Sequence, residues 1–127
     1  NLSWNKIDHI NLTAFDGLPS LKILNLSFNQ LDRIKPRQFK TLSNLQILLL
    51  SRNKINELND NSFEGLTQLK RLYLVNNNLE RFSRSQFEKL RNLEKLDLSE
   101  NHLELDEDNN EFIPLANSNS SLYEQEI

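Results

Sequence analysis

The sequence of 127 residues has no cysteine and no methionine, and only two glycines and three prolines. Without cysteine the chain can form neither disulfides nor thiolate metal sites, which by itself favours a reducing compartment. The few glycines and prolines leave few conventional tight-turn signals. No apolar run is long enough to cross a bilayer, so we expect no membrane contact within this segment. Because no initiator methionine precedes Asn1, we expect a mature or excised piece of a longer protein.

Charge is divided unevenly along the chain. Residues 1–96 hold all 15 lysines and arginines with 9 acids, whereas residues 97–127 hold the other 9 acids and no basic residue. Runs of like charge are usually solvated or disordered. We therefore expect a basic body and an acidic, flexible tail at 107–127. A degenerate terminal repeat is the alternative for the tail, and an acidic arm that binds a partner is less favoured.

An internal repeat of 24 residues dominates the sequence. It gives a partial unit 1–20, full units 21–44, 45–68 and 69–92, and a decaying unit 93–106. One asparagine and several apolar residues return at this interval without a gap. The asparagines are Asn5, Asn29, Asn53, Asn77 and Asn101, and the apolar columns begin at Leu2, Ile7, Phe15, Leu18 and Leu21.

The columns predict how each unit folds. Leu24 and Leu26 alternate with period two, which indicates a short strand with these side chains inward. A single coil cannot bury its own apolar side, so the coils must stack and align their strands in a parallel sheet. The chain bends where each strand ends. An asparagine there carries donors and an acceptor for backbone groups that have no sheet partner, within and between coils.

The columns resemble the leucine-rich-repeat family in its typical 24-residue subclass, Leu-x-x-Leu-x-Leu-x-x-Asn-x-Leu-x-x-Ile-x-x-x-x-Phe-x-x-Leu-x-x, over about residues 1–106. The resemblance implies an α/β-type repeat solenoid, an arc with a parallel β-sheet on its concave side and a mostly irregular convex side. It also implies an extracellular protein. The phenylalanine-containing form occurs mainly in Toll and Toll-like receptors, adhesion proteins, matrix proteoglycans and insect immune proteins.

The sequence departs from this pattern in two ways. After Leu103 the next apolar columns hold Asp106 and Glu111, with Phe112 one residue late. The cysteine-rich caps that usually close extracellular arrays are also missing, and we expect them outside this chain. A cytoplasmic array is the alternative.

Outward positions on the predicted strands form columns across the concave side. Neighbouring strands lie roughly 4.8 Å apart, so members of a column should be in contact. We predict an apolar patch with aromatic anchors beside it and cations at its rim, which is typical of a partner-binding surface. The patch is Ile23, Ile47, Leu49, Tyr73 and Val75, the anchors are Trp4 and Phe28, and the cations are Arg52, Arg71 and Lys95.

Four sites match the acceptor pattern for N-glycosylation: Asn1, Asn11, Asn25 and Asn119. Asn1 and Asn25 share one column, so the repeat alone could produce their motifs. Asn11 is expected on the back of a coil, where a glycan is best tolerated, and we favour it.

We predict no enzymatic activity, no cofactor and no metal site. His9 and His102 fall in different columns, and neither is placed to activate the repeated serines of the strands. The acids at 106–108 lack the spacing and central glycine of a calcium loop. Basic residues on the coil backs alternate with acids, so we predict no nucleic-acid partner.

These observations favour a protein- or ligand-binding segment of an extracellular receptor or secreted recognition protein, in innate immunity or cell-surface signalling. The parent could be membrane-anchored. A matrix or adhesion scaffold and an intracellular interaction adaptor are the alternatives.

Overall fold

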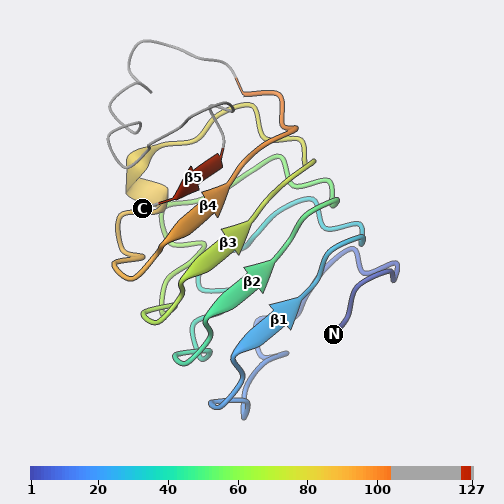
Figure 1. The fold of residues 1–127 in the computed structure, drawn as a ribbon. Coiled ribbons are helices and arrows are strands. Elements are labelled where there is room, and N and C mark those ends of the chain that lie inside the picture. The colour runs from blue at the N-terminus through green and yellow to red at the C-terminus, as the bar shows by residue number, and fades with distance from the viewer. Residues whose placement is uncertain (104–123, 127) are drawn as a thin grey trace.

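The structure, a computed structural model, describes residues 1–103 and 124–126 as a stack of coils, each of which adds a short strand to one sheet (Figure 1). The parallel strands are β1 (Ile23–Asn25), β2 (Ile47–Leu49), β3 (Arg71–Tyr73) and β4 (Lys95–Asp97). Each pairs with the next in a register of one repeat, so Ile23 lies beside Ile47 and Ile47 beside Arg71. The chain then returns to the next strand through irregular segments, and a single turn of 3-10 helix, η1 (Arg84–Gln86), is the one helix in the described part. The fold is a leucine-rich-repeat solenoid arc.

A fifth strand, β5 (Glu124–Glu126), lies at the end of the sheet next to β4. It runs antiparallel, with Glu126 beside Lys95 and Glu124 beside Asp97. Since the coils of the array all add parallel strands, β5 does not continue the 24-residue stacking. The predictions for Asp106, Glu111, Phe112 and Asn119 lie outside the described residues.

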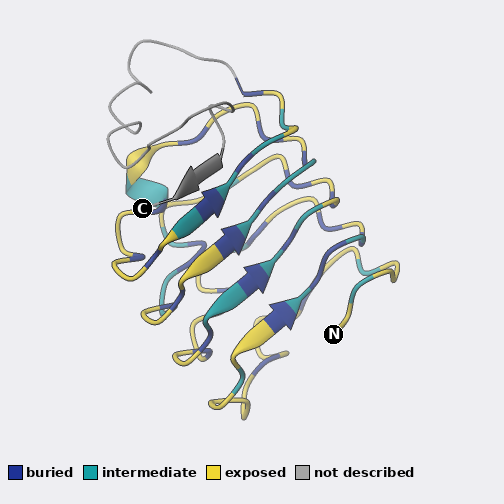
Figure 2. Ribbon diagram, viewed as in Figure 1, coloured by how far each residue is buried: buried dark blue, intermediate teal, exposed yellow. Residues whose placement is uncertain are grey.

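The apolar columns form one continuous core behind the sheet. The middle residue of every parallel strand is buried and its two neighbours are not (Figure 2). Leu48 and Leu72 have no exposed surface, and burial of each such side chain stabilises the fold by about 1.5–3 kcal/mol. On the opposite side of the core the phenylalanine column packs as stacked pairs, with ring centroids 5.9 Å apart for Phe15 and Phe39.

The repeated asparagines join each coil to both neighbours. Asn53 Nδ2 donates to the carbonyls of Leu50, in its own coil, and Leu26, in the preceding one, both at 3.0 Å. Its Oδ1 accepts the amide N–H of Leu31 at 3.0 Å. The same pattern recurs at Asn29, Asn77 and Asn101. One amide thus serves several backbone groups that the core removes from water.

A second polar column, which the sequence analysis missed, connects the coils on their convex side. Gln38 Nε2 donates to the carbonyl of Ile10, Ser62 Oγ to that of Ile34, and Gln86 Nε2 to that of Leu58, each 28 residues earlier. Gln38 and Ser62 are buried. A polar residue at this position in each of the three full repeat units, among apolar columns, was the signal for this column.

The first coil stacks on one side only. Leu2 and Leu18 keep 40% and 45% of their surface exposed, whereas their column partners in later coils are buried. Asn5 is exposed, and its Nδ2 donates to Leu2 and Ser3 within its own coil. These residues show what a coil loses where no neighbour covers it.

Replacement of Asn53 by alanine should lower the free energy of unfolding by about 2–4 kcal/mol, because it leaves buried amide and carbonyl groups without partners. Asn5→Ala is the matched control from the same column and should cost less than about 1 kcal/mol, since its contacts are exposed. Urea unfolding followed by circular dichroism measures both. Equal losses for the two variants would contradict the structural role assigned to Asn53.

Replacement of Gly65 by alanine should also destabilise the stack, by about 2–4 kcal/mol. Gly65 has φ of +92°, and an added Cβ would collide with the Lys40 carbonyl oxygen and lie 2.8 Å from Lys40 Cα in the preceding coil. Gly17 has a similar φ of +79° but nothing within 4 Å of that position. Gly17→Ala should therefore cost only the backbone strain, about 1–2 kcal/mol. If Gly65→Ala lowered the free energy of unfolding less than Gly17→Ala in the same urea experiment, the close approach of these coils would be ruled out.

Candidate functional site

The candidate site lies on the solvent-facing side of the parallel strands. Inward burial of Leu24, Leu48 and Leu72 turns the flanking strand residues outward, and the register sets them side by side. Ile47 and Leu49 are half-buried, and Ile23 keeps 56% of its surface exposed at the edge of the sheet. Leu49 lies beside Tyr73. The structure thus brings the predicted apolar residues together on one face.

A second row of side chains follows the ends of the strands. Backbone pairing continues past the strands as Arg52 N–H donates to the Val75 carbonyl at 2.8 Å, which keeps Val75 in line with the patch. In every coil, the residue at the repeat position of Arg52 has positive φ. This conformation is unusual for residues other than glycine. This row is Trp4, Phe28, Arg52, Asn76 and Glu100, with φ between 54° and 60°.

The recurrent conformation stacks the side chains of neighbouring coils at the rim of the sheet. The rings of Trp4 and Phe28 lie 3.7 Å apart and nearly parallel, with an interplanar angle of 12°. Arg52 continues the stack with its guanidinium carbon 5.4 Å from the centre of the Phe28 ring. Trp4, the only tryptophan of the chain, keeps 73% of its surface exposed. Stacking holds these large side chains in place and leaves their outer surfaces available for a partner.

Charge on this face changes along the array. Lys95 lies over Tyr73, with its ammonium nitrogen 6.0 Å from the ring centre. Asp97 Oδ1 accepts both the N–H of Ser99, at 3.0 Å, and its hydroxyl. Arg71 is exposed at the start of β3. The first coils are therefore apolar and aromatic, and charged side chains enter from the third coil onward.

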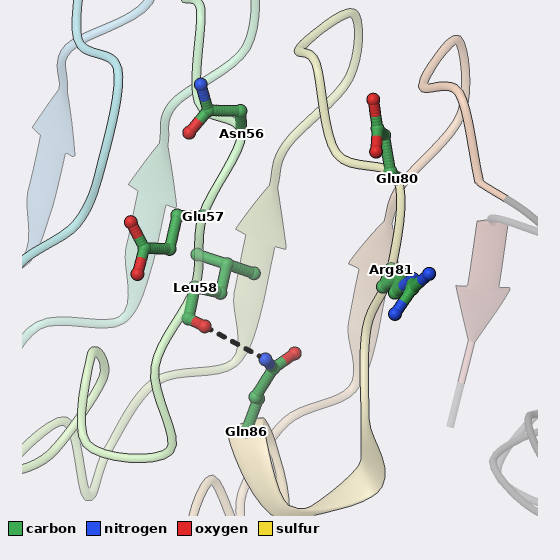
Figure 3. A pocket seen from close by; sticks show the side chains of 6 residues that line it. All are labelled: Asn56, Glu57, Leu58, Glu80, Arg81 and Gln86. Atoms are coloured by element: carbon green, nitrogen blue, oxygen red, sulfur yellow. Dashed lines mark hydrogen bonds between the residues drawn. The ribbon is translucent and has the colours of Figure 1, made fainter.

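A pocket of about 230 Å³ lies outside the sheet, on the segments that follow the asparagines of two neighbouring coils (Figure 3). Gln86 Nε2 donates to the Leu58 carbonyl across it at 3.1 Å. Small-molecule sites usually enclose about 300–1,000 Å³ with mainly apolar walls. This pocket is smaller and all but one of its lining residues are polar or charged, so it is not the favoured site. Its lining residues are Asn56, Glu57, Leu58, Glu80, Arg81 and Gln86.

The acceptor asparagines for glycosylation occupy different surroundings. Asn11 is exposed on a turn, where its Oδ1 accepts the N–H and hydroxyl of Thr13 at 3.1 and 3.0 Å. Asn1 is exposed as well, whereas Asn25 is half-buried within β1 on the concave face. Asn119 lies outside the described residues.

Charged groups elsewhere offer little for chemistry. His9 Nδ1 lies 3.0 Å from Asp8 Oδ1, and this hydrogen bond lowers the pKa of the Asp8 carboxyl group. Both side chains are about three-quarters exposed. Over residues 1–103 and 124–126 no group of three histidine or acidic residues is placed to hold a metal ion. The same residues contain no helix with the length and apolarity needed to cross a bilayer.

Comparison with known structures finds the same architecture in larger proteins. The leucine-rich-repeat domain of APL1B is 30% identical, with a TM-score of 0.79 over 84% of this chain and 31% of that chain. TLR13 in complex with single-stranded RNA is 35% identical, with a TM-score of 0.76 over 80% of this chain and 14% of that one. Toll from the Drosophila Toll–Spatzle complex is 25% identical, with a TM-score of 0.70 over 76% and 14%. This chain therefore spans less than a third of each of these neighbours.

No curated protein matches the chain. The sequence profile described as "Leucine rich repeat" matches in four overlapping stretches, residues 1–31, 21–79, 43–103 and 67–117. Together these stretches cover residues 1–117, which include every asparagine of the repeat from Asn5 to Asn101. The chain belongs to the leucine-rich-repeat family.

Proposed function

We propose that this chain is the partner-binding segment of an extracellular receptor or secreted recognition protein, and that it binds a protein on the concave sheet. The observation that carries the proposal is the continuous outward surface over β1–β3, where apolar side chains lie in register beside an exposed aromatic stack. Such clusters with charged rims are typical of interaction surfaces.

The extracellular, immune part of the proposal draws on the neighbours. Toll is described in complex with Spatzle, in development and innate immunity, and TLR13 in complex with single-stranded RNA. Both complexes are recognition events of a leucine-rich-repeat protein. For this chain a protein partner fits better than a nucleic acid. The positions that face outward on the first two strands, β1 and β2, are Ile23, Asn25, Ile47 and Leu49, without a basic residue among them.

The double replacement of Leu49 and Tyr73 by glutamate should weaken binding to a partner by at least about tenfold, because it places charge at the centre of the patch. A panel of purified extracellular protein domains, tested against the wild-type chain by surface plasmon resonance, supplies the partner. Ser43→Glu with Thr67→Glu is the matched control, since these two exposed residues also occupy one column in adjacent coils, away from the strands. Loss of binding in the control, or unchanged binding in the Leu49 and Tyr73 variant, would contradict the proposed site.

Expression through a secretory pathway should attach a glycan at Asn11. The mass of the purified chain should fall after treatment with peptide-N-glycosidase, and the shift assigned to this position should be absent in Asn11→Gln. Asn25→Gln is the informative comparison, because a glycan there would cover the concave face. An Asn11 peptide without a glycan by mass spectrometry would count against the extracellular assignment.

A further inference from the structure

The two arginines at the concave site have no acidic partner in the described part of the chain. The ion pairs there join Asp8 with His9, Asp32 with Arg33, and Glu64 with Arg37, none of them on the strands. Arg52 stacks on Phe28, and Arg71 is exposed at the start of β3. Each guanidinium therefore presents N–H donors to solvent.

Two acids of the array near the arginines already accept hydrogen bonds. Asp97 accepts two hydrogen bonds from Ser99, and Glu100 Oε2 accepts one from Asn76 Nδ2 at 3.2 Å. Both carboxylates lie in the fifth coil, beyond Tyr73. The two arginines without an acidic partner thus lie in the part of the sheet around β2 and β3, and Lys95 on β4 lies beside Arg71.

The two arginines lie on opposite sides of the apolar pair Leu49 and Tyr73 along the strand direction. Arg71 is beside Ile47, two residues before Leu49, and Arg52 follows Leu49 by three residues. Paired backbone continues to Arg52, which bonds to the Val75 carbonyl. At about 3.3 Å per extended residue, the two arginine positions are at most roughly 17 Å apart along the strand direction.

We infer that the concave site takes an extended, acidic segment of a partner protein, with an apolar side chain over Leu49 and Tyr73 and a carboxylate toward each arginine. The inference deepens the proposed function and rests on it. Guanidinium groups bind carboxylates through paired N–H donors, and stacking on Phe28 holds Arg52 ready for such a contact. The engaged acids of the fifth coil repel such a segment from that end, which fixes its position over β2 and β3.

The test begins with a display library of peptides about eight residues long, enough when extended to span the arginine pair. Selection on the wild-type chain should enrich peptides that carry one acidic residue on each side of an apolar residue. Fluorescence anisotropy of an enriched peptide should show at least about tenfold weaker binding to the variant Arg52→Gln with Arg71→Gln, and a smaller loss of affinity with salt. The control, Arg81→Gln with Arg84→Gln, removes the same charge from two exposed arginines away from the strands and should bind as the wild type does.

Several outcomes would overturn the inference, and they separate it from the proposed function. The acidic ligand would be refuted if the enriched peptides depended on Leu49 and Tyr73 but lacked acids, or if the arginine replacements did not weaken their binding. Either result would still support the concave binding site. Binding that is insensitive to all four residues would refute both. Failure to enrich any acidic peptide, or arginine-dependent binding of a single-stranded RNA oligonucleotide instead, would also refute the acidic segment.

Discussion

The structure depends on the hydrogen bonds that each buried asparagine side chain makes to the coil before it. Asn53 bonds to backbone groups of Leu26 and Leu31 in the preceding coil, and Asn77 repeats those contacts one coil later. A backbone carbonyl or amide in the core must have a partner, so a coil with a different length or phase would leave these groups unpaired at high cost. This constraint explains why the 24-residue interval holds without a gap through Leu103.

The same constraint creates the candidate site. Because the coils have the same length, residues at the same position of the repeat lie side by side. Their outward side chains therefore form continuous rows across the sheet. Function then depends on which residues occupy the rows. Here the apolar pair Leu49 and Tyr73 lies between Arg71 and Arg52, and the aromatic stack of Trp4 and Phe28 extends the surface toward the first coil. A stable stack and a variable exposed surface are compatible, because the outward residues take no part in the core.

Much of the fold could be predicted from the sequence, because the information is periodic. The spacing of Leu24 and Leu26 indicated a strand and its inward face, and repetition indicated parallel stacking.

The positive φ at Trp4, Phe28 and Arg52 could not be predicted, since these residue types rarely adopt it and no glycine marks the position. The convex column of Gln38, Ser62 and Gln86 was missed because its residue types vary while their shared backbone contact does not. The antiparallel strand β5 lies outside the periodic part of the chain, where no repeat can indicate it. For the candidate site, the positions of residues within the repeat predicted which side chains point outward. The stacking of Arg52 on Phe28 was seen only in the structure.

Hydrogen exchange at the amides bonded to the asparagine side chains tests the mutual dependence of the coils most directly. Leu31 and Ile55 donate to Asn53 and Asn77 within the stack, whereas Ile7 donates to Asn29 from the first coil, which stacks on one side only. If each coil is stabilised by its neighbours, Leu31 and Ile55 should exchange only on global unfolding and Ile7 much faster. Exchange of Ile55 as rapid as that of Ile7 would show that neighbours on both sides give a coil no added stability, which contradicts the account.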